Sequence, residues 1–238
     1  MIHHVSIITA KLKENVDFYT NTLGMKFVKK TVNFDNPFTY HIYYGNENSD
    51  PGSIVTFFGH PGSENGKKGK GVAHGLILQV PNDIYKKVGD EVTDPDGLLI
   101  KLKSGDTHKI LGVITTASKD FLDKYDLTSE SEFVEGDAYG VVGAGVLHHT
   151  AFSTKDEESQ IRFRESIEKV SNVSPVIDRF YFKSIYFQEP NGCLIEVATY
   201  GPGFLIDEDK PEDMGKNLRL PPQYQKYHEE IEARLPKL

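Results

Sequence analysis

Apolar and polar positions alternate in short runs along most of this chain, the pattern of β-strands with one buried face. Near the N-terminus such a run covers residues 3–8, and Val16, Tyr19 and Leu23 then recur at helical spacing before a glycine. Three further strands are predicted at residues 26–32, 39–44 and 53–58. The pattern therefore predicts a βαβββ unit in the first 65 residues.

The same order of elements recurs near the other end of the chain. The matching segments are, in pairs, 3–7 and 148–152, 41–44 and 184–187, and 54–57 and 194–197. A helix predicted over residues 156–170 completes the second copy. A repeated order of elements within one chain indicates duplicated structural modules.

The middle of the chain shows shorter versions of this pattern. Strands are predicted at 72–80, 98–101 and 108–115, with a further strand or pair within 132–142. A short helix is predicted from its N-cap Ser118 to Asp126. These residues are expected to form two abbreviated modules.

A C-terminal segment follows the last module. It is acidic at first and ends in a helix predicted over residues 223–235, with Tyr224, Tyr227 and Ile231 on the side that packs against the body. The prediction is an α+β protein of tandem βαβββ modules. Its expected divisions are 1–65 for the first module, 66–144 for two abbreviated modules, 145–203 for the last module and 204–238 for the helical tail.

Composition narrows the classes of function. The 238 residues carry a net charge of −8, which argues against a nucleic-acid surface, and no apolar run could span a bilayer. The first strand leaves no room for a signal peptide, so we expect a cytoplasmic protein. Its single cysteine, Cys193, excludes an internal disulfide. The expected ligand is a small molecule.

Glu196 stands in an otherwise apolar predicted strand. A carboxylate buried there alone would cost several kcal/mol, so it needs a cation or a metal as partner. Because alternate residues of a strand share a face, the face that holds Glu196 can also hold His4, His149 and His41. Two imidazoles and one carboxylate form the donor set of non-haem Fe(II) sites with open positions.

Each of these residues also has a simpler interpretation. A single histidine beside an apolar strand is commonly a hydrogen-bonded core residue, and Glu196 alone could be a rim acid or half of an ion pair. The repeat favours a metal site because His4 and His149 occupy the same place in both copies. Their neighbours His3 and His148 are expected to face outward.

Tandem βαβββ units with histidine on the first strand and glutamate on the last resemble the vicinal oxygen chelate superfamily, which includes glyoxalase, bleomycin-resistance proteins and extradiol dioxygenases. The run YFQEPNGCLIE, which ends at Glu196, fits the closing part of the type I extradiol signature. About residues 1–65 and 145–238 are similar to ring-cleaving dioxygenases that act on hydroquinones, whereas the middle is shorter than that group's pattern. The resemblance implies paired modules in cupped mixed sheets.

The resemblance also implies roles for individual residues. His4, His149 and Glu196 would bind Fe(II), with Mn(II) or another divalent ion as alternatives. Tyr186 would act as an acid or hydrogen-bond donor near the metal. His41 would be the base that accepts a proton from a substrate hydroxyl.

Arg179 and Tyr43 are expected to bind substrate. The extradiol signature begins with a further histidine, and this chain has no histidine in the corresponding region, where Arg179 lies. The arginine could still bind a substrate oxygen, but the absence of this histidine favours a quinol over a catechol.

The expected function is therefore a metal-dependent ring-cleaving dioxygenase that uses O2 and a small aromatic diol, with a place in quinone detoxification. One alternative is a glyoxalase-type isomerase or thiol transferase, but the first module has Thr56 where those enzymes carry a second carboxylate. Another is a resistance protein that binds an aromatic drug without turnover. The sequence leaves open whether the chain forms a homodimer.

Overall fold

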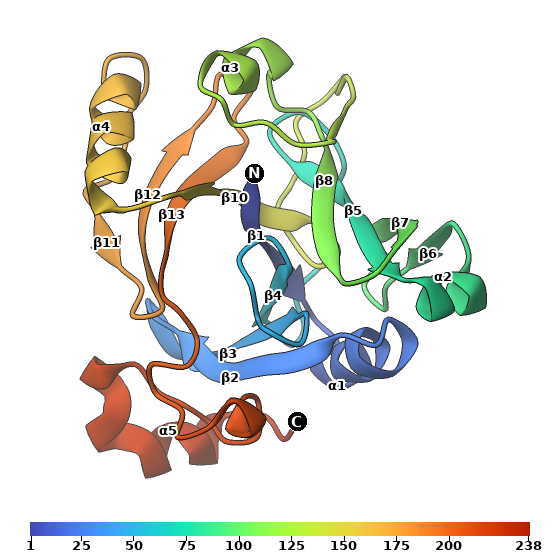
Figure 1. Cartoon of the computed structure of the whole chain (residues 1–238), viewed down its shortest axis with the longest axis vertical. Helices are drawn as coiled ribbons and strands as arrows, with labels where there is room; N and C mark the ends of the chain where they lie inside the picture. The colour runs from blue at the N-terminus through green and yellow to red at the C-terminus, as the bar shows by residue number, and fades with distance from the viewer.

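The computed structural model describes residues 1–238, and β-strands dominate it (Figure 1). The strands are β1 (Ile2–Thr9), β2 (Lys26–Asn33), β3 (Asn36–Gly45), β4 (Ile54–Gly59), β5 (Ala73–Pro81), β6 (Glu91–Thr93), β7 (Leu99–Gly105), β8 (Lys109–Thr115), β9 (Glu132–Phe133), β10 (Leu147–Thr154), β11 (Ile177–Asp178), β12 (Phe182–Gln188) and β13 (Leu194–Pro202). The α-helices are α1 (Leu12–Asp17), α2 (Asn82–Val88), α3 (Lys119–Lys124), α4 (Glu157–Ile167) and α5 (His228–Arg234).

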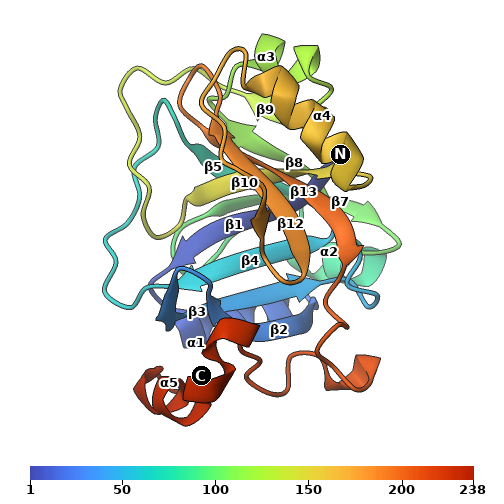
Figure 2. The same ribbon diagram turned by 90° about the vertical axis from the view of Figure 1, so that its left-hand side faces the viewer.

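The strands form two sheets. The larger has eight strands in the order β11-β12-β13-β10-β1-β4-β3-β2, and the smaller has five in the order β6-β7-β5-β8-β9. At the centre of the large sheet β1 is antiparallel to β10, while β4 is parallel to β1 and β13 is parallel to β10. The two ends of the chain thus build one continuous sheet, which curls around its concave side (Figures 1 and 2).

The register of the strands supports the internal repeat. Tyr186 lies opposite Glu196 across β12 and β13, and Tyr43 lies opposite Thr56 across β3 and β4. The predicted α+β class, with mixed sheets built from βαβββ modules, is confirmed. The boundaries at residues 65, 144 and 203 stay a prediction.

Alternation along the central strands decides which side chains face the concave side. Val5 and Ile7 of β1 and Ile195 and Val197 of β13 are buried in the main hydrophobic core, which also contains side chains of the five-stranded sheet. Burying each such side chain contributes about 1.5–3 kcal/mol. The apolar positions therefore fix the face to which the intervening polar residues point.

Some predicted elements are shorter or shaped differently in the structure. The helix predicted to reach Leu23 leaves α-geometry after Asp17 and continues as a π-helical turn, Phe18–Thr22. Of the strand expected within 132–142, only β9 forms, and α2 and β6 were not predicted. Beyond β9 the chain packs backbone to backbone against residues 64–70, where a Cβ added to Gly69 would clash with the Ala138 carbonyl oxygen.

The C-terminal segment lies beside β2 and β3 (Figures 1 and 2). Its predicted helix is a 3-10 turn, Pro222–Tyr227, followed by α5. Ile231 is buried as expected, whereas Tyr227 is 45% exposed. The segment is anchored by an ion pair of 2.7 Å between the buried Lys29 and Asp207. No helix of the chain combines the length and apolar character that crossing a membrane requires.

Candidate metal centre

A cavity of about 300 Å³ opens on the concave side of the large sheet. Every residue that the sequence predicts for the site lines this cavity: His4, His41, Tyr43, His149, Arg179, Tyr186 and Glu196. They come from β1, β3, β10, β12 and β13 and from the turn between β11 and β12. The fold thus brings together residues from both ends of the chain.

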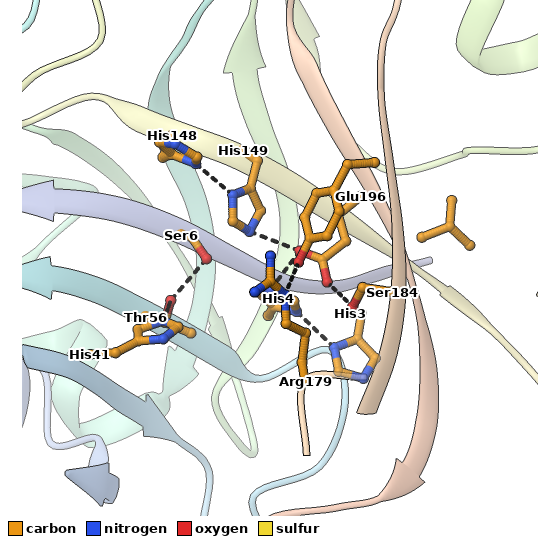
Figure 3. Close-up of polar contacts among 12 residues, drawn as sticks. His3, His4, Ser6, His41, Thr56, His148, His149, Arg179, Ser184 and Glu196 are labelled. Carbon is orange, nitrogen blue, oxygen red and sulfur yellow. Dashed lines mark hydrogen bonds and ion pairs between the residues drawn. The ribbon is translucent and has the colours of Figure 1, made fainter. Parts of the chain in front are cut away.

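Three of these residues form a compact donor cluster at the centre of Figure 3. Glu196 Oε2 lies 3.3 Å from His4 Nε2 and 2.9 Å from His149 Nε2. The three donor atoms all lie within 4.8 Å of one another, and the three side chains are buried. Burial alone would raise the pKa of Glu196, but the adjacent imidazoles hold this pKa well below its usual value.

The cluster fits a divalent metal ion. Although they are close, His149 Nε2 and Glu196 Oε2 are both buried without an aligned hydrogen-bond partner, which is costly in a protein interior. Ligands at right angles on an ion at about 2.1 Å are about 3 Å apart, close to the observed spacing. Imidazole and carboxylate donors in this ratio suit Fe(II), and they also accept other first-row divalent ions.

Each histidine of the cluster is held by the histidine before it. His3 Nδ1 lies 2.9 Å from His4 Nδ1, and His148 Nδ1 lies 2.8 Å from His149 Nδ1 (Figure 3). Hydrogen bonding at Nδ1 orients the ring and leaves Nε2 for a ligand. Burial lowers the pKa of His3 to about 3 and that of His148 to about 4, so both imidazoles are neutral at pH 7.

The expectation that His3 and His148 face outward is wrong. His3 is buried, and His148 is partly buried and lines the cavity. The pairing of β1 with β10 explains the difference, because Ile2 and His4 are opposite the consecutive residues 152 and 151, which makes His3 an extra residue in the ladder. His148 is the extra residue on β10 in the same way. These bulges break the alternation on which the expectation relied.

Polar groups of the last module surround Glu196. Ser184 Oγ donates a hydrogen bond to Glu196 Oε1 (Figure 3). Arg179 Nε donates to the Tyr186 hydroxyl at 3.1 Å, and Arg179 Nη1 lies 3.1 Å from Asp35 Oδ2. Burial raises the pKa of Tyr186, so its hydroxyl keeps its proton and can donate it to a ligand in the cavity. Arg179 supplies a positive charge beside this hydroxyl.

His41 has a different environment from the one expected of a base that meets substrate directly. Its Nδ1 lies 2.8 Å from the Tyr43 hydroxyl, and its Nε2 lies 2.9 Å from Thr56 Oγ1. Thr56 Oγ1 in turn lies 2.9 Å from Ser6 Oγ. Burial lowers the pKa of His41 well below its usual value, so the ring is neutral. The sequence did not point to Ser6. It pointed to Thr56 only as the residue that stands where glyoxalase-type enzymes carry a second carboxylate.

Comparison with known proteins adds a family assignment. A model of the family described as Glyoxalase/Bleomycin resistance protein/Dioxygenase superfamily matches residues 1–197. The protein named "Putative ring-cleaving dioxygenase MhqE" from Bacillus subtilis (strain 168) is 34% identical over 299 aligned residues, which cover 100% of this chain and 98% of that protein. The alignment is longer than the 238-residue chain, so the relative contains stretches that this chain lacks.

Two further similarities concern a second named enzyme and a solved structure. "Chlorohydroquinone/hydroquinone 1,2-dioxygenase" from Sphingobium indicum is 24% identical over 303 aligned residues, with 97% of this chain and 94% of that protein covered. A crystal structure described as that of a putative dioxygenase from Bacillus subtilis subsp. subtilis str. 168 superposes with a TM-score of 0.89 at 30% identity. That superposition covers 100% of this chain and 96% of the other.

Proposed function

This chain belongs to the glyoxalase/bleomycin resistance protein/dioxygenase superfamily, and we propose that it is a metal-dependent dioxygenase that cleaves the ring of a small aromatic diol. The observation that carries the proposal is the buried cluster of His4, His149 and Glu196, in which the facing atoms of His149 and Glu196 lack aligned hydrogen bonds. Relatives named as ring-cleaving dioxygenases support the reaction class.

The proposed ligands are His4 Nε2, His149 Nε2 and a Glu196 carboxylate oxygen, with Fe(II) as the ion and Mn(II) as an alternative. When bound, such an ion would stabilise the negative charge of a diol oxygen and offer a neighbouring position for O2. One carboxylate leaves a divalent site with a net positive charge. This charge favours an anionic phenolic ligand over a neutral one.

The residues around the cluster are suited to bind and orient the diol. The Arg179 guanidinium is positioned to stabilise a phenolate oxygen, and the Tyr186 hydroxyl beside it to donate a hydrogen bond to the same ligand. Phe34, Phe58 and Phe182 also line the cavity, where they can pack on an aromatic ring and exclude water. Fixing the ring in this way lowers the entropic cost of reaction.

We further propose that the substrate is a hydroquinone rather than a catechol, consistent with a role in quinone detoxification. Two features support this choice. Arg179 lies in the region where extradiol enzymes carry a further histidine, and one relative is named as a chlorohydroquinone/hydroquinone dioxygenase. The glyoxalase-type alternative is less suited to this site because Thr56, with no charge, stands where a second carboxylate is needed.

Oxygen uptake after anaerobic loading with Fe(II) tests the proposal. We expect consumption of one O2 per ring with hydroquinone, methylhydroquinone or chlorohydroquinone, slower turnover of catechols, and about one iron per chain. His149→Ala removes one of three ligands and is expected to abolish both iron binding and oxygen uptake. His74→Ala changes a histidine on β5 outside the cavity and serves as the control.

Two results would contradict the proposal. Full iron retention by His149→Ala would remove this residue from the ligand set. Wild-type protein that contains iron but consumes no O2 with any diol, while it isomerises a thiol adduct or only binds the aromatic compound, would favour one of the alternative functions.

A further inference from the structure

A chain of hydrogen bonds crosses the concave face of the first module. It runs from Ser6 on β1 to Thr56 on β4, and from there to His41 and Tyr43 on β3. The three links measure 2.9, 2.9 and 2.8 Å. Figure 3 shows the first part of this chain, the hydrogen bond between Ser6 and Thr56.

Both ends of the chain reach the substrate cavity. Ser6, His41 and Tyr43 line this cavity. Thr56 does not line it and lies between Ser6 and His41 in the chain of hydrogen bonds. All four side chains are buried, with no more than 8% of any residue exposed. Apolar residues could fill these positions without any need for hydrogen bonds, so four linked polar groups call for a reason beyond packing.

Every group in the chain can both donate and accept a hydrogen bond. The hydroxyls of Ser6, Thr56 and Tyr43 each carry one proton and free lone pairs, and neutral imidazole carries a proton on one nitrogen and a lone pair on the other. The low pKa that burial imposes on His41 keeps the imidazole in this neutral form. The whole chain can therefore reverse its direction without any member becoming charged.

We propose that these four side chains form a proton relay that accepts a proton from the substrate at one end and releases a proton at the other. The inference rests on the proposed function, because the protons come from a phenolic diol. It replaces a single histidine base with a neutral chain in which His41 is an inner link. Ser6 and Tyr43 are the members that would contact substrate.

The step conserves atoms and electrons. A substrate hydroxyl gives its proton to Ser6 Oγ while the Ser6 proton moves to Thr56 Oγ1 and the Thr56 proton moves to His41 Nε2. The His41 Nδ1 proton then passes to the Tyr43 hydroxyl oxygen, which releases its own proton to a substrate or water oxygen in the cavity. Only O–H and N–H bonds form and break, and no oxidation occurs in this step.

The position of the chain suits this task. Ser6 is the register partner of His149, so the relay begins next to a proposed metal ligand. Thr56 occupies the place that Glu196 holds in the other half of the sheet, where a carboxylate would bind a cation instead of passing a proton. A hydroxyl at this position keeps the chain neutral and continuous.

Thr56→Val tests the relay because it removes the central hydroxyl with little change in shape, and Thr56→Ser restores the hydroxyl. With hydroquinone and Fe(II)-loaded enzyme, we expect Thr56→Val to lower kcat by about 100-fold, the scale of lost proton-transfer catalysis, with KM within about twofold of wild type. The solvent isotope effect should reflect several protons in wild type and one in Thr56→Val. Thr56→Ser should recover kcat to within about threefold.

A readout without turnover uses nitrohydroquinone, whose absorbance reports its ionisation, bound under anaerobic conditions. Because a relay changes the rate of proton transfer, we expect the bound probe to lose its proton more slowly in Thr56→Val than in wild type after rapid mixing. Ser153→Ala is the matched control, since it removes a hydroxyl on β10 that is buried without a partner. It should behave as wild type in every assay, and iron content should be the same in all variants.

The outcomes separate the relay from the proposed function. If diols are cleaved but Thr56→Val keeps the kcat and isotope effect of Ser153→Ala, the relay is wrong and the dioxygenase proposal stands. If no diol is cleaved but the bound probe loses its proton slowly in Thr56→Val alone, the relay stands and the proposed reaction is wrong. A probe that ionises at the same rate in all variants, or that does not bind, overturns the relay.

Discussion

In the last module Tyr186 lies opposite Glu196 across two neighbouring strands, and in the first module Tyr43 lies opposite Thr56 in the same register. The partners of these residues also correspond in position. Ser184 donates to Glu196, whereas His41 hydrogen-bonds to Thr56. The last module therefore presents a charged carboxylate to the cavity, whereas the first module presents a neutral chain of hydrogen-bonded side chains.

This difference shows how a duplicated scaffold can give an asymmetric site. Each half contributes one histidine, held at Nδ1 by the preceding histidine, so the imidazole donors are equivalent. The carboxylate comes from only one half. The proposed ion would then keep a net positive charge and open coordination positions. The neutral side chains of the first module would be available to bind substrate and transfer protons.

The largest effect is expected from Thr56→Glu, which makes the first half of the sheet carry a carboxylate as the last half does. We expect ring cleavage to fall at least about 100-fold, because the added carboxylate interrupts the relay and neutralises the ion. Metal affinity should be equal to that of wild type or higher. A carboxylate buried without a cation costs several kcal/mol, so the thermal stability of this variant should depend on added metal far more than that of wild type.

Thr56→Gln is the matched control because glutamine has nearly the same size as glutamate but carries no charge. Its thermal stability should respond to metal as the wild type does. Oxygen uptake by Thr56→Glu at the wild-type rate would contradict the proposal that the first module contributes a neutral relay and the last module the carboxylate.

A smaller effect is expected when Glu196 is retained but its carboxylate loses the hydrogen bond from Ser184. Ser184→Ala removes the hydrogen bond to Glu196 Oε1, which helps to orient the oxygen that faces the imidazoles. Loss of such a supporting contact weakens metal affinity by about 10-fold. Titration with Fe(II) under anaerobic conditions measures this change, and Ser153→Ala provides the control. Unchanged affinity would mean that packing alone orients Glu196.

The last prediction concerns stability and not the site itself, at the turns through which each half of the large sheet meets the small sheet. Both turns have the pattern acid-Pro-x-Gly and end at a glycine with positive φ, 94° at Gly97 and 96° at Gly192. At the first turn Asp94 is buried and accepts a hydrogen bond of 3.2 Å from the Tyr19 hydroxyl. Burial raises the pKa of Asp94 to about 6.

The sign of the resulting pH dependence follows from this shift. Between pH 3.8 and about 6 the folded protein holds the Asp94 proton more tightly than the unfolded chain does, so this group costs stability as pH rises through that range. Asp94→Asn removes the cost, at most about 3 kcal/mol, and its amide can donate to Tyr19 instead. In urea unfolding, its advantage over wild type should grow from pH 4 to pH 6 and then stay constant. A difference that does not vary with pH would contradict this account, and exposed Asp106→Asn controls for the lost charge.

The parts of the fold and site that sequence could predict are those with a local pattern. Alternation and the repeated order of elements predict the strands and the common face of His4, His149 and Glu196, because these depend on periodicity within each strand. The bulges at His3 and His148 arise where β1 pairs with β10, strands distant in sequence, so no local pattern contains them. Ser6 and Thr56 are ordinary strand residues until the fold links Ser6 to Thr56, and Thr56 to His41, by hydrogen bonds.

We propose that both ends of the chain hold one metal ion through three specific atoms. Anomalous diffraction at the iron edge, from crystals grown anaerobically with Fe(II), tests it most directly. We predict one peak at about 2.0–2.2 Å from His4 Nε2, His149 Nε2 and a carboxylate oxygen of Glu196, with the Thr56 hydroxyl not coordinated. A peak bound by other residues, or iron-containing crystals without a peak at these atoms, would contradict the account.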